Sequence, residues 1–435
     1  MKLNYLLLFY ILLSCEPNIT DPNLGNEGKE PQDSIVCPVD TLVDVEKEEY
    51  ERMMTLPIQD LLKECYPENA FLFGAAAPMR IFNDNKINDI YTQRYIKEYS
   101  YNTPENDFKQ EQVCREPSMA WNRSGYMKHI KIARQYGMQI RCHGPISPQC
   151  SKWARTDTRT PEELEEMLNI YMSGLAKDLE LNKDVVKWMD VVNETLTQSN
   201  QKNGIGYDGT ENNVTYKPDD WFGPREGTDW WENPWPMIGF ETLTYNGKSM
   251  NVPKYIRMAF DIANQHAPSI KKIYNEHGGT LNTAAWDKIK WTILALREKG
   301  VQIDGVGWQA HVSVGWEKDK AQVQALHDLI AWCHANDLDF LITELDVTVS
   351  KGNNNTKIDE NALSTTRNAQ AATIGAITEI MLQNVGKGAH SINTWRMEDR
   401  FGGGKTFASI FNKETNPNPA YKTVKELLIK YRIEK

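Results

Sequence analysis

The sequence predicts an α/β protein built as a closed (β/α)8 barrel, also called a TIM barrel, with a long Trp-rich insertion after its fourth strand. Short apolar runs alternate with longer helical patterns over most of the 435 residues, which is typical of parallel strands joined by helices. About eight such runs favour a closed barrel over an open, doubly wound sheet. The chain has no G-x-G-x-x-G motif and no P-loop, which weakens the open-sheet alternative and its nucleotide ligands.

The strands are predicted from compact apolar runs, and the helices from an apolar period near 3.6 residues. Thr160-Pro161-Glu162-Glu163 is a strong helix start, because it supplies a cap, a proline in the first turn and acids at the positive end of the helix. The strand-like runs are Phe71–Ala76, Gln139–His143, Val185–Val192, Ile270–Tyr274, Val301–His311, Leu338–Val347 and Ser391–Trp395. The other helical stretches are Ile130–Tyr136, Trp291–Lys299, Ala321–Ala335 and a last one through Val424 and Tyr431.

The insertion, at about residues 198–253, is polar but rich in aromatic side chains, and that content argues for an ordered segment. The whole chain has 13 Trp against 12 Phe, and Trp rings either stack on ligands or fill a core. We therefore expect either that one of the insertion's Trp residues contacts a glycan or that they pack within a long loop: Trp221, Trp230, Trp231 and Trp235. Three other Trp lie in predicted strand motifs and are expected near the mouth of the barrel: Trp188, Trp308 and Trp395.

Residues 1–14 are predicted to be a signal peptide, because Lys2 precedes the apolar run Leu3–Leu13, which is too short to span a bilayer. The run ends at Leu12-Leu13-Ser14-Cys15, which resembles the bacterial lipobox, whose cysteine is lipidated; a plain secretory signal is the alternative. Residues 15–44 are rich in Asn, Asp, Pro and Gly and predict a flexible, lipid-anchored tether before a barrel domain at 45–435. We expect an exported bacterial lipoprotein at the outer membrane or cell surface, with the periplasmic face as an alternative.

Composition and charge narrow the classes of function. The composition is that of an ordinary soluble globular protein, which excludes disordered and fibrous classes. The net charge of −10 disfavours nucleic acid and anionic membrane surfaces as partners. Six cysteines remain besides Cys15, an even number that permits disulfides in an exported protein without fixing their pairing. No cysteine or histidine has the spacing of a zinc site, so we expect no bound metal. We also expect no cofactor, and we expect the protein to be a monomer.

Two glutamates stand where predicted strands end. Glu194 follows Val191-Val192-Asn193, and Glu344 follows Leu341-Ile342-Thr343. The active sites of (β/α)8 barrels lie at the carboxyl ends of the strands, so these two side chains are expected to face each other across the mouth of the barrel. Glycoside hydrolysis needs such a pair, since one carboxyl group protonates the leaving oxygen while the other attacks the sugar or activates water. The pair therefore predicts a glycosidase.

The segments around both glutamates resemble the signatures of family 10 glycoside hydrolases, the retaining endo-xylanases. Trp188–Glu194 is similar to the acid/base signature, and Ile342–Asp346 is similar to the nucleophile signature. Further segments are similar to family motifs in the same order: Thr103–Lys109, Ile140–His143, Ile273–Glu276, Asp304–His311, Thr394–Asp399 and Pro419–Tyr421. The resemblance covers roughly residues 70 to 430 and implies cleavage of internal β-1,4-xylosidic bonds of xylan or decorated xylan by double displacement.

The resemblance also implies roles for individual residues. Glu344 is the implied nucleophile and Glu194 the implied acid/base. His311 is expected to donate a hydrogen bond to Glu344 and to be oriented by Asp346, which lies on the same face of the strand as Glu344. The residues expected to bind the polysaccharide substrate are Glu105, Asn106, Lys109, His143, Asn193, Gln309 and Trp395.

The chain departs from the family at the walls of the catalytic sugar site. Ser147 and Pro148 stand where the family has a Trp and a second His, and Arg396 stands where a Gly usually follows the Trp of the eighth strand. Phe401–Gly404 occupies the place of a further Trp. These differences predict a more open or more polar pocket, and they leave a different β-linked glycan as an alternative substrate.

Charged residues follow Trp395: Arg396, Glu398 and Arg400. They either recognise an acidic group on the polymer, such as a uronic acid, or form a solvated loop. An alternative from another class is a surface lipoprotein that binds glycan without cleaving it. That function would show the loss of one carboxylate, whereas both Glu194 and Glu344 are present.

Overall fold

The computed structural model describes residues 39–82, 86–115, 120–148, 158–197, 204–205, 221–222, 233–350, 360–399, 405–406 and 409–433. The predicted signal peptide and Cys15 lie outside these residues. The chain divides into two compact units, residues 1–49 and 50–435, and the second contains the barrel. Helix α1 (Val39–Thr55) begins within the segment predicted as a tether. Within the described ranges, no helix is long and apolar enough to cross a membrane.

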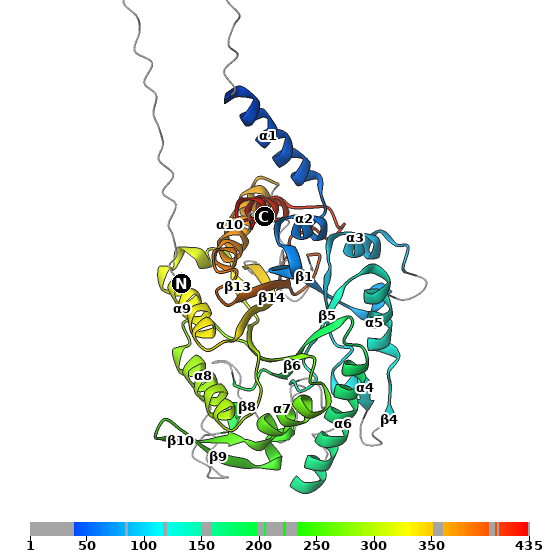
Figure 1. The fold of residues 1–435 in the computed structure, drawn as a ribbon, viewed down its shortest axis with the longest axis vertical. Helices are drawn as coiled ribbons and strands as arrows, with labels where there is room; N and C mark the ends of the chain where they lie inside the picture. Colours follow the sequence, from blue (N-terminus) through cyan, green and yellow to red (C-terminus); the bar gives the residue numbers. More distant parts are fainter. Residues whose placement is uncertain are drawn as a thin grey trace, which may run out of the picture. The chain divides into compact units, whose positions relative to one another are not determined.

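Eight parallel strands close into a barrel, which confirms the predicted fold (Figure 1). The ring runs in the order in which the strands are named here, and the last strand pairs with the first. Its members are β1 (Leu72–Ala77), β2 (Tyr101–Pro104), β5 (Gln139–Cys142), β6 (Val186–Asn193), β11 (Lys271–Glu276), β12 (Gly305–Trp308), β14 (Asp339–Ser350) and β15 (Ala389–Thr394). The strand predicted at Val301–His311 is shorter in the structure, because β12 ends at Trp308 and His311 begins a separate strand, β13 (His311–Ser313), that pairs with β14.

Helices surround the barrel (Figure 1). The predicted helix start at Thr160 is confirmed as a capping box, because Thr160 Oγ1 accepts from the Glu163 amide at 3.3 Å and Glu163 accepts from the Thr160 amide at 2.8 Å. The helix predicted from Trp291 begins earlier, where Asn282 caps it. The α-helices after α1 are α2 (Ile58–Cys65), α3 (Ile90–Glu98), α4 (Gln110–Val113), α5 (Ser124–Tyr136), α6 (Pro161–Leu181), α7 (Lys254–His266), α8 (Thr283–Glu298), α9 (Lys320–Ala335), α10 (Glu360–Gln383) and α11 (Pro419–Lys430).

The short elements are 3₁₀ turns and two-residue strands outside the ring. The turns are η1 (Pro67–Asn69), η2 (Met79–Phe82) and η5 (Trp316–Lys318), and the strands are β3 (Cys114–Arg115), β4 (Ala120–Trp121) and β16 (Lys405–Thr406). β3 pairs with β4, and β16 pairs with the far end of β14.

The hydrophobic core has two parts. The larger part lies between the strands and the helices, and the smaller part is a cluster of five inward-facing side chains inside the barrel: Leu72, Tyr101, Trp188, Ile273 and Leu341. The ring of Trp188 lies 5.2 Å from the ring of His390, at the beginning of β15. Trp188 therefore fills the amino-terminal end of the barrel, and its predicted position near the mouth is wrong.

The insertion after β6 is ordered where the structure describes it, and it lies against α8. Its elements are β7 (Gly204–Ile205), β8 (Trp221–Phe222), η4 (Trp235–Ile238) and the hairpin of β9 (Phe240–Tyr245) and β10 (Lys248–Pro253). Trp221 and Trp235 are fully buried, and the Trp221 Nε1–H donates to the Asn251 carbonyl at 3.1 Å while Lys288 Nζ lies 4.4 Å from its ring. A glycan-binding role is therefore wrong for these two rings. Trp230 and Trp231 lie outside the described residues.

Buried cysteines are scattered through the described part of the barrel. Cys142 and Cys333 are free thiols at 0% exposure, and burial raises the pKa of both. A buried thiol with a raised pKa is a poor nucleophile, so these side chains are packing residues.

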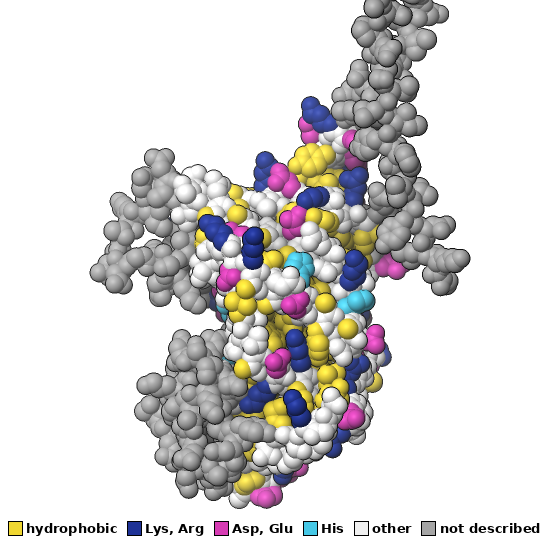
Figure 2. Space-filling view, turned by 90° about the vertical axis from the view of Figure 1, so that its left-hand side faces the viewer, with side chains coloured by type: hydrophobic (Ala, Val, Ile, Leu, Met, Phe, Trp, Pro, Cys, Tyr) yellow, Lys and Arg dark blue, Asp and Glu magenta, His cyan; other side chains and the backbone are white. Residues whose placement is uncertain are grey.

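On the face drawn in Figure 2, basic and acidic side chains are interspersed, so charge of one sign does not gather there.

Candidate active site

Both predicted catalytic glutamates lie at irregularities in the sheet: Glu194 directly follows β6, and Glu344 lies inside β14, just before the last residue of β14 that pairs with β15. The ladder between β6 and β11 gains one extra residue on β6 shortly before Glu194, and the ladder between β14 and β15 gains one on β14 at Glu344. Such bulges redirect side chains and are common beside active sites. Glu194 also has a φ of 53°, a left-handed conformation that is unusual for any residue but glycine. The local backbone is thus shaped to aim both carboxylates at the mouth of the barrel.

Glu344 is buried and surrounded by positive charge. Its side chain is 4% exposed, with Oε2 lying 3.4 Å from His311 Nε2 and Oε1 lying 3.7 Å from His143 Nδ1. Burial alone would raise the pKa of Glu344, but the charges of His143 and His311, with Arg141 behind them, lower it to about 2. Glu344 is therefore ionised at neutral pH, which is the state that a nucleophile requires.

His311 lies between the carboxyl groups of Asp346 and Glu344. His311 on β13 stands directly opposite Asp346 on β14, and His311 Nδ1 lies 3.1 Å from Asp346 Oδ1. Burial would lower the pKa of His311, but the carboxylates of Asp346 and Glu344 raise it to about 10. His311 is thus an imidazolium that donates to Glu344 through one nitrogen while Asp346 fixes the other.

A fully buried ion pair lies behind the nucleophile. Arg141 on β5 donates through Nη1 to Asp190 Oδ2 at 2.5 Å and through Nη2 to the Thr343 carbonyl at 2.7 Å. Asp190 Oδ2 also lies 2.9 Å from His143 Nδ1. The pair therefore fixes both the backbone just before Glu344 and the ring that faces it. Arg141 and Asp190 were not predicted as functional residues, although each is a charged residue inside an apolar predicted strand.

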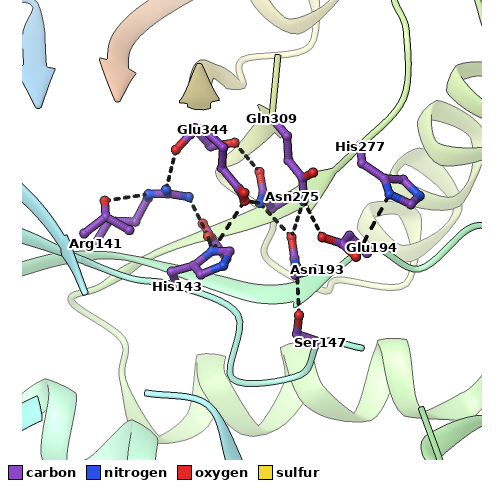
Figure 3. A network of polar contacts seen from close by, with 12 residues as sticks. Arg141, His143, Ser147, Asn193, Glu194, Asn275, His277, Gln309 and Glu344 are labelled. Carbon is purple, nitrogen blue, oxygen red and sulfur yellow. Dashed lines mark hydrogen bonds and ion pairs between the residues drawn. The ribbon is translucent and has the colours of Figure 1, made fainter. Parts of the chain in front are cut away.

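Three side-chain amides form a continuous chain between the two glutamates (Figure 3). Asn275 Nδ2 donates to Glu344 Oε1 at 3.1 Å and to Asn193 Oδ1 at 2.7 Å. Gln309 Nε2 donates to the same Asn193 oxygen at 3.2 Å and to Glu194 Oε1 at 2.8 Å. All three amides are buried, so the two carboxylates are held by one rigid network. Asn193 and Gln309 were predicted, whereas Asn275 was given no role.

The direction of each amide is fixed by its neighbours. The Thr343 hydroxyl donates to Asn275 Oδ1 at 2.7 Å, which turns the Asn275 amino group toward the carboxylate. Asn193 Nδ2 donates to Ser147 Oγ at 2.8 Å, so Ser147 orients a predicted sugar-binding amide. Gly307 on β12 leaves room for this network, because a Cβ there would lie 2.2 Å from Asn275 Oδ1.

The surroundings of Glu194 carry fewer charges than those of Glu344. Its side chain is 14% exposed, and its second oxygen, Oε2, lies 4.0 Å from His277 Nδ1. Glu276, at the end of β11, is fully buried, and burial raises its pKa. Glu276 and His277 were not predicted as functional residues. Their position directly after a predicted strand was the available signal.

The predicted sugar-binding residues lie around the same mouth. Trp395 is half-buried and meets the rings of His143 and His311 at centroid distances of 5.2 and 6.3 Å. Lys109 is 8% exposed, whereas Asn106 is exposed. Trp308, the last residue of β12, is fully buried and donates to the Gly278 carbonyl just after β11, so it lies at the carboxyl end of the barrel but is covered there, whereas Trp395 is partly exposed.

Glu105 does not stand alone at the end of β2, because it forms an ion pair with Arg396. The two follow β2 and β15, which flank β1, so the pair spans the end of β1. Glu398 is 7% exposed and accepts from the Tyr91 hydroxyl at 2.5 Å. The solvated-loop interpretation is therefore wrong for Arg396 and Glu398, while Arg400 lies outside the described residues.

Across the described ranges, no group of three or more His, Cys, Asp or Glu could hold a metal ion.

Comparison with known proteins gives a consistent result. The family model described as glycosyl hydrolase family 10 matches residues 61–217 and 244–427, more than half of the chain. The chain is 25% identical over 371 residues to endo-1,4-beta-xylanase B of Neocallimastix patriciarum, covering 85% of this chain but 35% of that protein. It is 25% identical to endo-1,4-beta-xylanase B of Thermotoga neapolitana, covering 78% of this chain and 83% of that protein.

The fold is shared with solved xylanase structures. Native xylanase 10B from Thermotoga maritima superposes with a TM-score of 0.62 at 22% identity, covering 86% of this chain and 98% of that one. The stretch that the family model leaves unmatched, residues 218–243, falls inside the insertion. The chain belongs to glycosyl hydrolase family 10 and is a glycoside hydrolase.

Proposed function

We propose that this enzyme cleaves internal β-1,4-xylosidic bonds of xylan or decorated xylan, with retention of configuration, using Glu344 as nucleophile and Glu194 as acid/base. The observation that carries the proposal is the pair of carboxylates, Glu194 directly after β6 and Glu344 inside β14, of which Glu344 is surrounded by cations while Glu194 accepts from a neutral amide. The curated relatives of the chain are endo-1,4-beta-xylanases, which supports xylan as the substrate.

In the first step, the ionised Glu344 attacks the anomeric carbon while Glu194 gives its proton to the oxygen that leaves. The positive charge of His311 keeps the pKa of Glu344 low, so the nucleophile does not need to lose a proton first. The product is a covalent glycosyl–enzyme ester, and the released sugar carries the proton from Glu194.

In the second step, Glu194 acts as a base. Glu344 has lost its negative charge in the ester, and the ionised Glu194 takes a proton from a water molecule that attacks the same anomeric carbon. Two displacements on one carbon restore its configuration. Asn193 keeps one amino hydrogen beyond its bond to Ser147, and this hydrogen is the donor that we assign to the sugar 2-hydroxyl.

A second candidate keeps the mechanism and changes the polymer to another β-linked glycan. The observations in its favour are two polar contacts around the mouth of the barrel, since Ser147 bonds to Asn193 and Arg396 pairs with Glu105. A binding-only function requires a lost carboxylate, and both carboxylates are present.

The test is product analysis on xylan, β-glucan and mannan with the wild-type enzyme, Glu344→Gln and a control, Glu165→Gln, which alters an exposed acid on α6. We expect xylo-oligosaccharides whose first-formed anomer is β, no products from Glu344→Gln and normal products from the control. Release of the α anomer first, or full turnover by Glu344→Gln, would overturn the mechanism. Turnover confined to glucan or mannan would support the second candidate.

We also propose that Cys15 carries a lipid that anchors the enzyme to the outer membrane or the cell surface. The support is the sequence Leu12-Leu13-Ser14-Cys15 after an apolar run. Cys15→Ser should abolish incorporation of labelled fatty acid and release the protein from membranes. Equal labelling of the two forms would contradict the proposal.

A further inference from the structure

His277 lies beside the predicted acid/base and takes no part in the mechanism described so far. It follows the last residue of β11, its side chain is 5% exposed, and its Nδ1 lies 4.0 Å from Glu194 Oε2 (Figure 3). The question is what an almost buried imidazole does at this distance from a carboxyl group that must gain and lose a proton in each turnover.

The surroundings of the ring decide which nitrogen titrates. His277 Nε2 lies 2.7 Å from the carbonyl oxygen of Leu196. A carbonyl oxygen only accepts, so Nε2 keeps its hydrogen in both charge states of the ring. Nδ1 is therefore the atom that gains or loses a proton, and it is the atom that faces Glu194.

The surroundings of Glu194 decide which of its oxygens carries the proton. Gln309 Nε2 donates to Oε1 at 2.8 Å, and a donor at this oxygen disfavours a hydrogen on it. The acidic hydrogen is therefore favoured on Oε2. The titrating nitrogen of His277 and the proton-bearing oxygen of Glu194 thus face each other.

A second carboxylate holds the other side of the ring. Glu276 Oε1 accepts from the His277 backbone amide at 3.1 Å and lies 3.4 Å from Nε2. Its other oxygen accepts from the backbone amide and the hydroxyl of Thr195 at 2.9 and 2.8 Å. The imidazole is thereby held between two carboxyl groups, Glu194 from the end of β6 and Glu276 from the end of β11, and the Glu276 carboxyl group is in turn fixed by Thr195, the residue that follows Glu194.

We infer that His277 is a positioning residue that shares one proton with Glu194 and so extends the activity of the enzyme to higher pH. The proton moves from Oε2 to Nδ1 once a side-chain rotation brings the two atoms from 4.0 Å to hydrogen-bond distance, which leaves a carboxylate beside an imidazolium, and it returns by the reverse step, so no proton is gained or lost overall. The singly protonated pair has two arrangements, whereas an isolated carboxyl group has one. A pair of this kind holds its last proton to a higher pH than the carboxyl group alone.

The first test does not depend on activity, and it therefore separates this inference from the proposed function on which it rests. The imidazole ¹⁵N signals of the full chain are followed against pH in the wild type and in Glu194→Gln, with His277→Gln to identify the signal. We expect Nδ1 of His277 to titrate, Nε2 to stay protonated, and the midpoint of Nδ1 to fall by about one pH unit or more in Glu194→Gln. An unchanged midpoint would overturn the inference.

The second test uses kcat/KM on a β-1,4-xylo-oligosaccharide. His277→Gln should lower the upper pH at which kcat/KM is half-maximal by about one unit, without changing KM. The same variant should retain its turnover of an aryl glycoside whose leaving group needs no protonation. A uniform loss at every pH and on both substrates would indicate a structural role and contradict the inference. His334→Gln, an exposed histidine at the end of α9, is the matched control.

Discussion

The two halves of the active site differ in how they control a proton. On the β14 side, Glu344 is 4% exposed and faces His143 and His311, and its pKa is about 2. On the β6 side, Glu194 is 14% exposed and meets a neutral amide and an imidazole 4.0 Å away. Fixed positive charge therefore surrounds only the carboxylate that must stay ionised.

The difference follows from the two chemical tasks. A nucleophile is most useful when it is always ionised, and neighbouring cations secure this in spite of burial. An acid/base must exist in both states within one cycle, and fixed cations would trap it as a carboxylate. The amide chain through Asn275, Asn193 and Gln309 joins the two sides without carrying net charge, so it fixes their geometry while leaving their electrostatics separate.

The largest expected effect is the loss of kcat when either carboxylate is replaced. The two losses should differ in how strongly they depend on the leaving group of the substrate. Glu344→Gln should lose about 10⁴-fold or more in kcat on every substrate, because no other group can form the covalent bond. Glu194→Gln should lose about 10²- to 10⁴-fold on xylo-oligosaccharides, but far less in the first step on an aryl glycoside with a good leaving group. Burst kinetics on that glycoside provide the measurement.

The opposite pattern would reverse the roles of the two residues. If Glu194→Gln were inactive on both substrates while Glu344→Gln kept its burst, Glu194 would be the nucleophile. Circular dichroism of both variants provides the folding control, since each replacement keeps the shape of the side chain.

The next effect concerns the amide chain between the two sides. Gly307→Ala adds a methyl group where Asn275 Oδ1 lies 2.2 Å away, so the Asn275 amide must move from both Glu344 and Asn193. We expect a loss of about 10²-fold in kcat, because a displacement of about 1 Å at a positioning group has that cost. Gly279→Ala changes a glycine in the loop after β11 that has open space around it and no left-handed φ, and it tests the general effect of the substitution. Equal kinetics for the two variants would contradict a positioning role for Asn275.

A smaller effect is expected on the pH profile of the nucleophile side. His311→Gln removes one of the cations that hold the pKa of Glu344 at about 2, so this pKa should rise. The acidic limb of kcat/KM reports the ionisation of the nucleophile, and it should move to higher pH by about one unit or more. The alkaline limb, which belongs to the Glu194 side, should stay in place. A shift of the alkaline limb alone would contradict this prediction, because it would show that His311 affects the ionisation of Glu194 and not that of Glu344.

The barrel could be predicted from the sequence because each strand is a short apolar run and each helix keeps a 3.6-residue period. The two glutamates followed from their places at strand ends and from the similarity of their segments to family signatures. Arg141, Asn275 and His277 were missed because their roles depend on which strands become neighbours around the ring. The pairing of β11 with β6 brings Asn275 beside Asn193, and no spacing along the chain encodes that contact.

The Trp residues were also hard to assign from the sequence, because their role depends on contacts between distant segments. Composition suggested sugar stacking, but Trp221 and Trp235 are fully buried and Trp188 fills the amino-terminal end of the barrel. Residue type alone does not separate a binding platform from a core filler, since both use the same flat, apolar ring. Burial decides, and burial depends on the packing of distant segments.

The smallest expected effect concerns the hydrogen bond between Ser147 and the Asn193 amide beside the sugar site. Ser147 Oγ accepts from Asn193 Nδ2 at 2.8 Å, and this contact leaves one amino hydrogen of Asn193 for the sugar. Ser147→Ala should reduce kcat/KM by about fivefold to tenfold on a xyloside, which corresponds to about 1 kcal/mol for one hydrogen bond. Ser147→Thr keeps the hydroxyl and should retain more activity.

The decisive comparison uses a 2-deoxy xyloside with the same leaving group. If Ser147 acts by aiming the Asn193 amide at the 2-hydroxyl, Ser147→Ala should make no further difference on the substrate that lacks this group, because the contact is already absent. An equal loss on both substrates would mean that Ser147 stabilises the loop after β5 and leaves the sugar contact unchanged. Asn193 belongs to the network of side-chain amides that joins Glu344 to Glu194. An effect confined to the 2-hydroxyl would therefore also show that this network tolerates a local change without disturbing either carboxylate.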